Sequence, residues 1–504
     1  MNITVSGGNY SACCFCGQCG YCTFTFMTTT LTREQFHSLW LQGEEVAFVL
    51  YEQLLTRVVA LEEQQAKDSG NSSKPPSSDG YKKKPLQPMT VSLRKKTGKK
   101  VGGQPGHAGT TLEQAVEPDQ VVVHRPDCCP DCQASLVDAA LAPESLVRRQ
   151  GFEMPVPKVV VTEHQTPSLL CPGCGKSCRA AFPDGATQPV QYGPNLLGFA
   201  TYLQGVHLLP FERCAQVVRE VTGAPFSPGS LARALQTVHG VLAPFEVGVR
   251  EALAHALVLH VDETGTRVAG KLQRHSKLCS YWFHTRCTPL LTFLFRHERR
   301  GAVAVEDLLR YTGILVSDFL SSYVKLSCKH AYCGAHILRE LVFQAQVRKQ
   351  GWAKALIDLL EGAVSACHQA RESGTEGKGL ADRGRLEAAY DRLVAEGLRE
   401  NPPPLVGKAT PAVNLLERLE AYKPSCLRFL SDLSVPFTNN QAERDLRMLK
   451  VKGKISGGFR TTEGADQYCR LRSYLATCRR QVLALLDCCP SLFNGRLITP
   501  ALIA

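Results

Sequence analysis

The sequence predicts an α/β protein built from several domains. The chain has 504 residues, which is enough for about three domains. Apolar runs with strand character are concentrated between residues 255 and 319, whereas helical periodicity dominates residues 195–240 and 337–432. Two Cys-x-x-Cys pairs lie in residues 112–188 and predict a small zinc-binding domain in front of the α/β part.

Composition and charge narrow the class of protein. Hydrophobic residues make up 44% and charged residues 21%, which is typical of a globular chain with a sizeable core. The net charge of +12 is clustered and indicates a polyanionic partner. No apolar run is long enough for a membrane span, and the first residues show no secretory signal, so we expect no membrane contact. The 22 cysteines then predict reduced thiols and metal sites rather than disulfides.

The first two segments carry weak signals. Residues 1–32 are a Cys-rich extension, which is either a small metal knot or a translated segment upstream of a true start at Met27, and we assign it no function. Residues 33–67 predict a helix with apolar residues at helical spacing. The pattern fits a short coiled coil, and therefore a homodimer, as well as it fits an amphipathic helix. The stripe consists of Leu50, Leu54, Val58 and Leu61.

Residues 68–111 predict an extended, mobile arm. The segment is rich in Pro, Gly, Ser and Lys and carries nine Lys or Arg residues. Such an arm can be a solvated linker, a strand of positive charge on DNA phosphates, or both. The candidate DNA-binding residues are Lys82, Lys83, Lys84, Arg94, Lys95 and Lys96.

The strongest metal signal lies in residues 112–188. Each Cys-x-x-Cys pair supplies two thiolates, so that two pairs complete a tetrahedral structural zinc site. The strand-like residues 158–164 predict a sheet that brings the pairs together. The expected ligands are Cys129, Cys132, Cys171 and Cys174, and the alternative ligands nearby are Cys128, Cys178, His124 and His164.

Residues 189–250 predict helices. Residues 211–240 divide into two helices around Thr222-Gly223-Ala224-Pro225, and Ser227 is expected to cap the second helix with Pro228 at its first position. The pattern fits a DNA-binding helix-turn-helix and an ordinary helical hairpin equally well.

Residues 251–480 predict the catalytic part. Its expected order is three strands, a helix over 301–313 and a fourth strand, and Asp262 and Asp318 are expected at the ends of the first and last strands. Each acid alone would more often be a turn or cap residue. Two strand-end acids with a third carboxylate are what a two-metal phosphoryl-transfer site needs, and hard oxygen ligands suit Mg²⁺ or Mn²⁺.

Glu443 is the candidate third acid. It lies on a predicted helix whose buried stripe would be Ala442, Leu446 and Leu449. Its position also fits a capping box with Asn440 or an exposed ion pair with Arg447. Helical residues 337–432 would form an insertion before it, and residues 481–504 a C-terminal tail. The nearby bases expected to meet DNA are Arg444, Arg447, Lys450, Lys452 and Lys454.

Six separated motifs resemble those of the insertion-sequence 66 family of transposases. They are "NSSKPPSSDG" (71–80), "GGQPGHAGTTL" (102–112), "VDETG" (261–265), "SDFLSSY" (317–323), "CGAHILREL" (333–341) and "TNNQAERDLRMLKVKGKISGGF" (438–459). The resemblance implies a ribonuclease-H-like core in which Asp262, Asp318 and Glu443 are the catalytic acids. It also marks Cys333 and His336 as a metal site or a brace for the active site.

The resemblance implies a bacterial, cytoplasmic, nucleoid-associated DNA transposase that cleaves and joins DNA, with companion proteins of the element as further partners. Gly334 departs from the family pattern, which has Trp at this position. Two rival functions use parts of the same chain. One is a zinc-dependent DNA-binding regulator or inactive remnant, and the other is a ribonuclease-H-like nuclease or junction resolvase.

Overall fold

The computed structural model describes residues 112–138, 147–154, 157–268, 281–301, 308–374, 379–403 and 409–503, with scattered residues before 112. Among the latter, β1 (Thr4–Val5) and β2 (Gly8–Asn9) pair antiparallel. The six candidate bases of the arm, most of the predicted helix over 33–67, and residues 302–307 of the predicted helix over 301–313 lie outside the described residues. No helix in the described ranges is long and apolar enough to cross a membrane.

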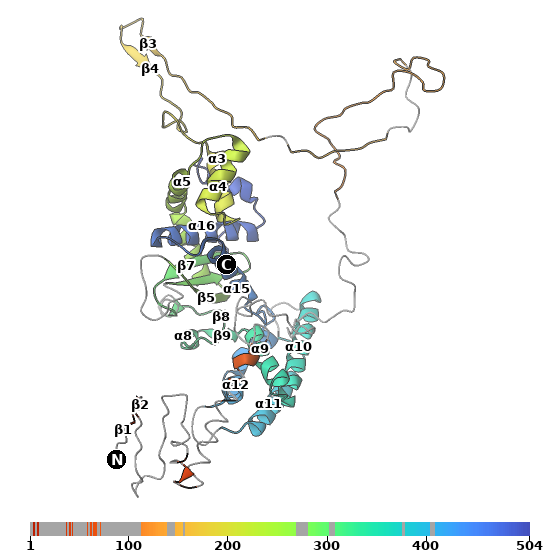
Figure 1. Ribbon diagram of the computed structural model, residues 1–504, viewed down its shortest axis with the longest axis vertical. Coiled ribbons are helices and arrows are strands. Elements are labelled where there is room, and N and C mark those ends of the chain that lie inside the picture. Colours follow the sequence, from red (N-terminus) through yellow and green to blue (C-terminus); the bar gives the residue numbers. More distant parts are fainter. Residues whose placement is uncertain are drawn as a thin grey trace. The chain divides into compact units, whose positions relative to one another are not determined.

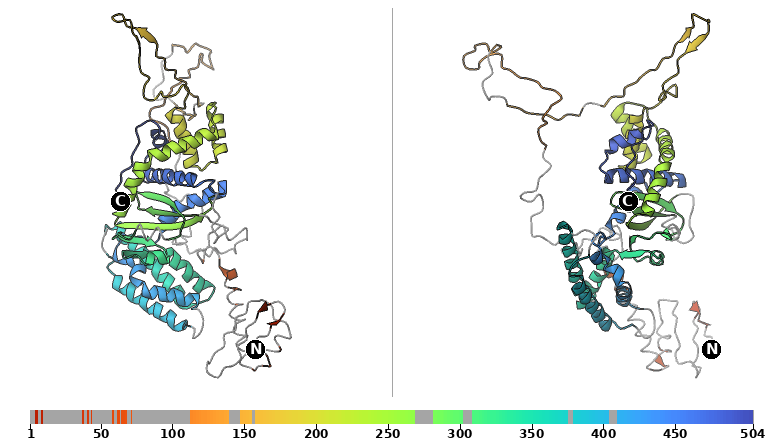
Figure 2. Two further views of the ribbon diagram at one scale, coloured as in Figure 1. Left: turned by 90° about the vertical axis from the view of Figure 1, so that its left-hand side faces the viewer. Right: turned by 180° about the vertical axis from the view of Figure 1, so that it is seen from behind.

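A five-stranded mixed sheet forms the centre of the larger unit (Figures 1 and 2). The strand order is β7-β6-β5-β8-β9, in which β5 pairs antiparallel with β6 and parallel with β8. The four predicted strands are confirmed, and β9 is an addition that its short polar sequence KHAY did not reveal. The strands are β5 (Val258–Thr266), β6 (Tyr281–Cys287), β7 (Thr292–His297), β8 (Ile314–Ser317) and β9 (Lys329–Tyr332).

Strand β5 is longer than the sequence predicts. The expectation that this strand ends at Asp262 is wrong, because Asp262 pairs with Thr285 of β6 and the strand continues to Thr266. The cause is that β5 has two neighbours of different length. Its parallel pairing with β8 stops at His260, whereas β6 supplies backbone partners over the remaining residues.

Between residues 194 and 254, four helices precede the sheet and pack with the C-terminal helices around one apolar core. The predicted break between two helices is confirmed: Gly223 ends α4 with a φ of 70°, and Ser227 Oγ accepts the Ser230 N–H at 3.1 Å to cap α5. Pro228 is the first residue of α5, as expected. The helices are α3 (Pro194–Gly205), α4 (Phe211–Thr222), α5 (Pro228–Val241) and α6 (Ala243–Ala254).

Helices dominate the described part of residues 337–432, as predicted. Chain contacts divide the molecule into two units, and the smaller one contains residues 336–362 and 384–421. In this unit the Tyr390 hydroxyl donates to Leu419 O at 2.9 Å, and Gly397 admits Trp352 and Leu416 so closely that a Cβ would clash. The two units share the helices of this part of the chain, which are α8 (Ser321–Val324), α9 (Gly334–Gln346), α10 (Gly351–Glu372), α11 (Arg383–Glu400), α12 (Pro411–Ala421), α13 (Lys423–Cys426) and α14 (Arg428–Ser431).

Three helices complete the larger unit: α15 (Asn440–Ser456), α16 (Thr462–Arg480) and α17 (Leu485–Ser491). Helix α15 packs on β5 and β6, and α16 packs on β7. The predicted stripe of α15, formed by Ala442, Leu446 and Leu449, is buried. Gly457 ends α15 with a φ of 73°, a conformation in which a Cβ would be strained.

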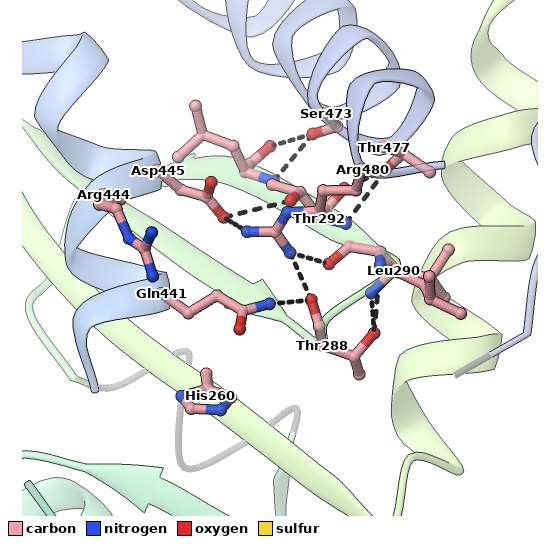
Figure 3. A network of polar contacts seen from close by, with 12 residues as sticks. His260, Thr288, Leu290, Thr292, Gln441, Arg444, Asp445, Ser473, Thr477 and Arg480 are labelled. Atoms are coloured by element: carbon pink, nitrogen blue, oxygen red, sulfur yellow. Dashed lines mark hydrogen bonds and ion pairs between the residues drawn. The ribbon is translucent and has the colours of Figure 1, made fainter. Parts of the chain in front are cut away.

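A buried polar network ties α15 and α16 to the turn between β6 and β7 (Figure 3). Arg480 Nη2 of α16 bonds Asp445 Oδ2 of α15 at 2.7 Å, while its Nη1 donates to Leu291 O at 2.6 Å and to Thr288 O. Gln441 of α15 also donates to Thr288 O. The same turn therefore holds both helices in register with the sheet.

We predict that Arg480→Met lowers the free energy of unfolding by about 3–5 kcal/mol, because it leaves the Asp445 carboxylate buried without its cation. The double variant Asp445→Leu with Arg480→Met should recover most of this loss, since neither charge remains. Chemical denaturation of the three proteins measures both effects. Equal stability of the two variants would show that the ion pair does not hold these helices.

Gly334 begins α9 in contact with an aromatic ring. Its N–H donates to Phe437 O at 2.8 Å, and a Cβ on Gly334 would overlap the Phe437 ring. Phe437 itself packs edge-on against Phe429, with ring centroids 4.8 Å apart. Phe437 therefore occupies the space next to the position at which the resemblance led us to expect Trp.

We predict that Gly334→Ala destabilises the protein by about 1–3 kcal/mol through overpacking. Adding Phe437→Leu should restore part of the loss, because the smaller side chain frees the space. Gly351→Ala is the matched control, since a Cβ at Gly351 meets nothing within 4 Å. The melting temperatures of the variants test this, and an unchanged value for Gly334→Ala would contradict the close packing.

Candidate active site

Two of the predicted acids lie near one another, one on β5 and one directly after β8. The parallel register of β5 and β8 pairs His260 with Val316, two residues before each acid. Besides burial, the charge of Asp318 raises the pKa of Asp262, as expected for two neighbouring carboxylates. Asp318 is the first residue after β8, as the sequence predicts.

Asp262 is held in an environment that disfavours its charge. Burial first, and then the charges of Glu263, Asp318 and Glu443, raise the pKa of Asp262 well above the usual range of an aspartate. Its Oδ1 accepts the N–H of Glu263 at 2.9 Å, which acts in the opposite direction. Three acids crowd one site where no cation of the described chain offsets Asp262, and this arrangement fits a divalent metal site.

Glu263 is a buried acid that sequence reasoning missed. Its Oε2 accepts the Tyr323 hydroxyl at 2.8 Å and its Oε1 accepts Arg300 Nε at 2.9 Å. Arg300 also lies over the Trp282 ring, 4.9 Å from its centroid. Burial, followed by the charge of Asp318, raises the pKa of Glu263. The sequence signal that could have identified Glu263 is an acid directly after Asp262, because adjacent residues of a strand point to opposite faces of the sheet.

Asn439 fixes the start of α15 against β5. Its Nδ2 donates to Val261 O at 2.7 Å, its Oδ1 accepts His260 Nδ1–H at 2.9 Å, and its backbone N–H donates to Cys333 Sγ at 3.2 Å. Burial lowers the pKa of His260, so its ring is the neutral partner of the amide. Asn439 is 2% exposed, and sequence reasoning gave it no role.

The capping box expected for Asn440 and Glu443 is wrong. The N-cap is Asn439, whose side chain forms no capping hydrogen bond because its amide is committed to β5. Glu443 is therefore the fourth helical residue, and its N–H donates to Asn439 O at 3.3 Å. One turn of helix thus connects the anchored Asn439 to Glu443 and directs this acid toward Asp262, whose pKa it raises.

The pair Cys333 and His336 lies at the start of α9, one turn apart. The structure brings one ligand atom from each of Cys333, His336 and Glu443 within 4.8 Å of one another. Among the described residues, Asp262, Asp318 and Glu443 are not gathered within 4.8 Å of one another. The role of Cys333 and His336, as metal ligands or as a brace for Glu443, stays a prediction.

The predicted basic face of α15 is only partly correct. Arg444, Arg447 and Lys450 are exposed along the helix, as is Lys454. Lys452 is 6% exposed, which contradicts the expectation that it shares this solvent-facing surface. The reason is helical geometry: Lys452 follows Leu449 at a spacing of three and continues the buried stripe.

The two Cys-x-x-Cys segments fold as separate tight turns. Cys129 N–H donates to Ala134 O at 2.9 Å, and Cys171 N–H donates to Lys176 O at 2.8 Å beside the hairpin of β3 (Ser168–Leu170) and β4 (Ser177–Arg179). Backbone N–H groups at Cys132 and Asp131 lower the pKa of Cys129, and those at Gly173 and Cys174 lower the pKa of Cys171.

These thiol environments fit zinc, because metal binding requires thiolates. In the described part of the chain the four cysteines are not gathered within 4.8 Å of one another. The predicted strand over 158–164 is wrong, since those residues are in no strand, and the hairpin of β3 and β4 follows them instead. No backbone pairing in the described ranges joins the two turns.

Comparison with known proteins agrees with this geometry. The family model described as "Transposase IS66 family" matches residues 189–467, and the zinc-finger binding domain of the same transposases matches residues 126–175. A family of unknown function matches residues 32–113. An uncharacterized protein, y4hP, of Sinorhizobium fredii (strain NBRC 101917 / NGR234) is 24% identical over 399 residues, covering 72% of this chain and 69% of that protein. The chain belongs to the IS66 family of insertion-sequence transposases and carries that family's zinc-finger domain.

Proposed function

We propose that the chain is a DDE transposase whose ribonuclease-H-like core cleaves and joins DNA through Asp262, Asp318 and Glu443. The observation that carries the proposal is that Asp318 after β8 and Glu443 of α15 both lie near enough to Asp262 of β5 for their charges to raise its pKa. The strand order, with three antiparallel strands followed by two parallel ones, supports the ribonuclease-H-like assignment. Family membership supports the reaction class.

The three acids would hold two divalent cations, Mg²⁺ or Mn²⁺, which in such sites activate the attacking oxygen and stabilise the leaving oxygen. In the first step, water attacks the phosphorus at the element's end, the bond to the 3′ oxygen breaks, and that oxygen leaves as a hydroxyl. In the second step, this hydroxyl attacks a target phosphodiester and displaces its 3′ oxygen. The protein's own contribution is to position the acids and DNA strands.

The remaining parts would recognise DNA and assemble the complex. Exposed Arg444, Arg447 and Lys450 project from the helix that carries Glu443, so phosphates beside the reacting strand can pair with them. We assign end recognition to the basic arm over 68–111, the zinc-binding domain over 112–188 and the helices over 189–250. A homodimer built through residues 33–67 and companion proteins of the element complete the proposed partners.

Glu443→Gln is predicted to abolish strand transfer, with a loss of at least about 100-fold, because an amide cannot replace a charged ligand of the cations. Labelled element-end DNA, target DNA and Mg²⁺ are incubated with each protein, with and without the companion proteins. Glu251→Gln, at an exposed acid on α6, is the matched control and should keep full activity. Cutting without joining by the unaltered protein would indicate a nuclease. Equal activity of Glu443→Gln would contradict the assignment of Glu443 as the third catalytic acid.

Asp262→Asn is predicted to raise the melting temperature by a few degrees at neutral pH without divalent cations in the buffer. The pKa of Asp262 is raised in the folded protein. Between the ordinary pKa of an unfolded aspartate and this raised pKa, the folded state binds a proton that the unfolded state has lost, so the free energy of unfolding falls as the pH rises through that range. The difference between the variant and the unaltered protein should disappear at acidic pH, where the carboxyl is protonated in both states.

Added Mg²⁺ should stabilise the unaltered protein, and more so at higher pH, because only the ionised carboxylate binds the cation. Asp262→Asn should lose most of this response, while Glu251→Gln should keep it. Thermal melts across pH with and without Mg²⁺ measure these effects. A lower melting temperature for Asp262→Asn at every pH would contradict the proposed charge crowding.

A further inference from the structure

A polar cavity lies in the larger unit, and its lining does not include the three acids. It has a volume of about 1000 Å³ and is lined mainly by residues of α4, α5, α15 and α16. Its walls include Pro210 and Phe211 where α4 begins, Pro228 where α5 begins, Lys452 near the end of α15, and Thr461 where α16 begins. The functional assignment made above does not use this cavity.

Three of the four helices present their N-termini to the cavity. Helix N-termini carry partial positive charge and N–H groups that bind anions. Ser227 Oγ and Thr461 Oγ1 each cap one N–H of α5 and α16. At α4 the N-cap is Pro210, and no side chain caps this helix. The positive ends of α4, α5 and α16 therefore converge on one space.

Two buried polar side chains line the same cavity: a lysine that contacts two aromatic rings and a tyrosine whose hydroxyl has no hydrogen-bond partner in the described chain. Lys452 is 6% exposed and forms no ion pair with the described chain; its Nζ lies 5.2 Å from the Phe459 ring centroid and 5.5 Å from that of Tyr468. Tyr468 is 4% exposed, and its hydroxyl has no hydrogen-bond partner among the described residues. A buried ammonium and a buried hydroxyl are costly unless something in the cavity pairs with them.

The rim adds further positive charge. Arg233 of α5 and Arg460, just before α16, are exposed at the cavity. Two acids also line it, but both have partners. Glu212 is ion-paired to Arg219 at 3.6 Å, and Glu463 accepts the Thr462 hydroxyl at 3.1 Å. The interior therefore presents donors and cations to an anion.

We infer that this cavity binds a backbone phosphate of DNA held by the transposase, with Lys452, Tyr468 and Arg460 as its ligands. The inference rests on the proposed function insofar as DNA is the substrate. Helix α15 carries both Glu443 and Lys452, nine residues apart, or about 14 Å along the helix axis. One duplex can span this distance in about four base steps. The contact would set the register of the strand at the acids.

The test measures DNA binding by the full-length protein without added divalent cations, so that loss of chemistry does not affect it. Fluorescence anisotropy with a labelled duplex is recorded over a range of salt concentrations. Lys452→Met keeps an apolar stem against the two rings, and Arg460→Gln changes an exposed residue that does not threaten folding. Arg479→Gln, exposed near the far end of α16 and outside the cavity, is the matched control.

Each cavity variant should weaken binding and lower the slope of log K against log salt by about one, the value for one lost phosphate contact. Arg479→Gln should leave the slope unchanged. Glu443→Gln should also keep the full slope, so a failure of the proposed catalysis and a failure of this inference give different results. Unchanged slopes in folded Lys452→Met and Arg460→Gln proteins would overturn the inference.

A parallel measurement separates DNA phosphate from a free anion. Melting temperatures are recorded with inorganic phosphate and pyrophosphate. Stabilisation of the unaltered protein that is lost in Lys452→Met, together with a reduced DNA slope, supports a phosphate site used by DNA. The same stabilisation with an unaltered DNA slope would assign the cavity to a small free anion and overturn the DNA contact.

Discussion

The attachment of Asn439 to β5 is the constraint on which the proposed catalytic site depends. The proposed third acid comes from a helix that begins far along the chain from the sheet, because the bonded His260 and Asn439 are 179 positions apart in the sequence. A helix of this kind could rotate or slide on an apolar surface without losing much buried area. Three hydrogen bonds of the buried Asn439 remove this freedom: two of its side-chain amide with β5 and one of its backbone N–H with Cys333. The ion pair of Asp445 with Arg480 fixes the same helix a second time, six residues further along the chain.

The site also shows how buried acids affect the stability of the folded protein. Asp262 and Glu263 are adjacent in one strand, both are largely buried, and the charge of Asp318 raises the pKa of each. Glu263 is hydrogen-bonded to Arg300 and Tyr323, which offset its burial. For Asp262, the described residues supply neighbouring acids and the Glu263 N–H. The uncompensated negative charge therefore lies where a cation would bind, and acids with perturbed pKa values are common at the functional sites of enzymes.

The sequence predicts the acids and most strands and helices because their signals are local. Apolar runs identify β5 and β8, and a Gly or Pro marks most helix ends. The missed features depend on tertiary contacts. Asn439 and Asn440 are equivalent as local caps, and only the carbonyl of Val261 decides between them. The local sequence predicts Lys452 as a surface base, whereas in the folded protein it packs against the Phe459 and Tyr468 rings. Strand β9 has too few residues for a detectable alternation, and the end of β5 is set by β6.

The hydrogen bonds between α16 and β7 have a consequence for the time at which the protein becomes active. Thr292 N–H donates to Thr477 Oγ1, a residue 185 positions later, and Leu294 N–H donates to Ser473 Oγ. Contacts of such long range form only after most of the chain has been synthesised. A nascent chain therefore exposes Asp262 and Asp318 well before Glu443 and its supporting helices exist. The proposed catalytic site is therefore complete only once translation has passed α16.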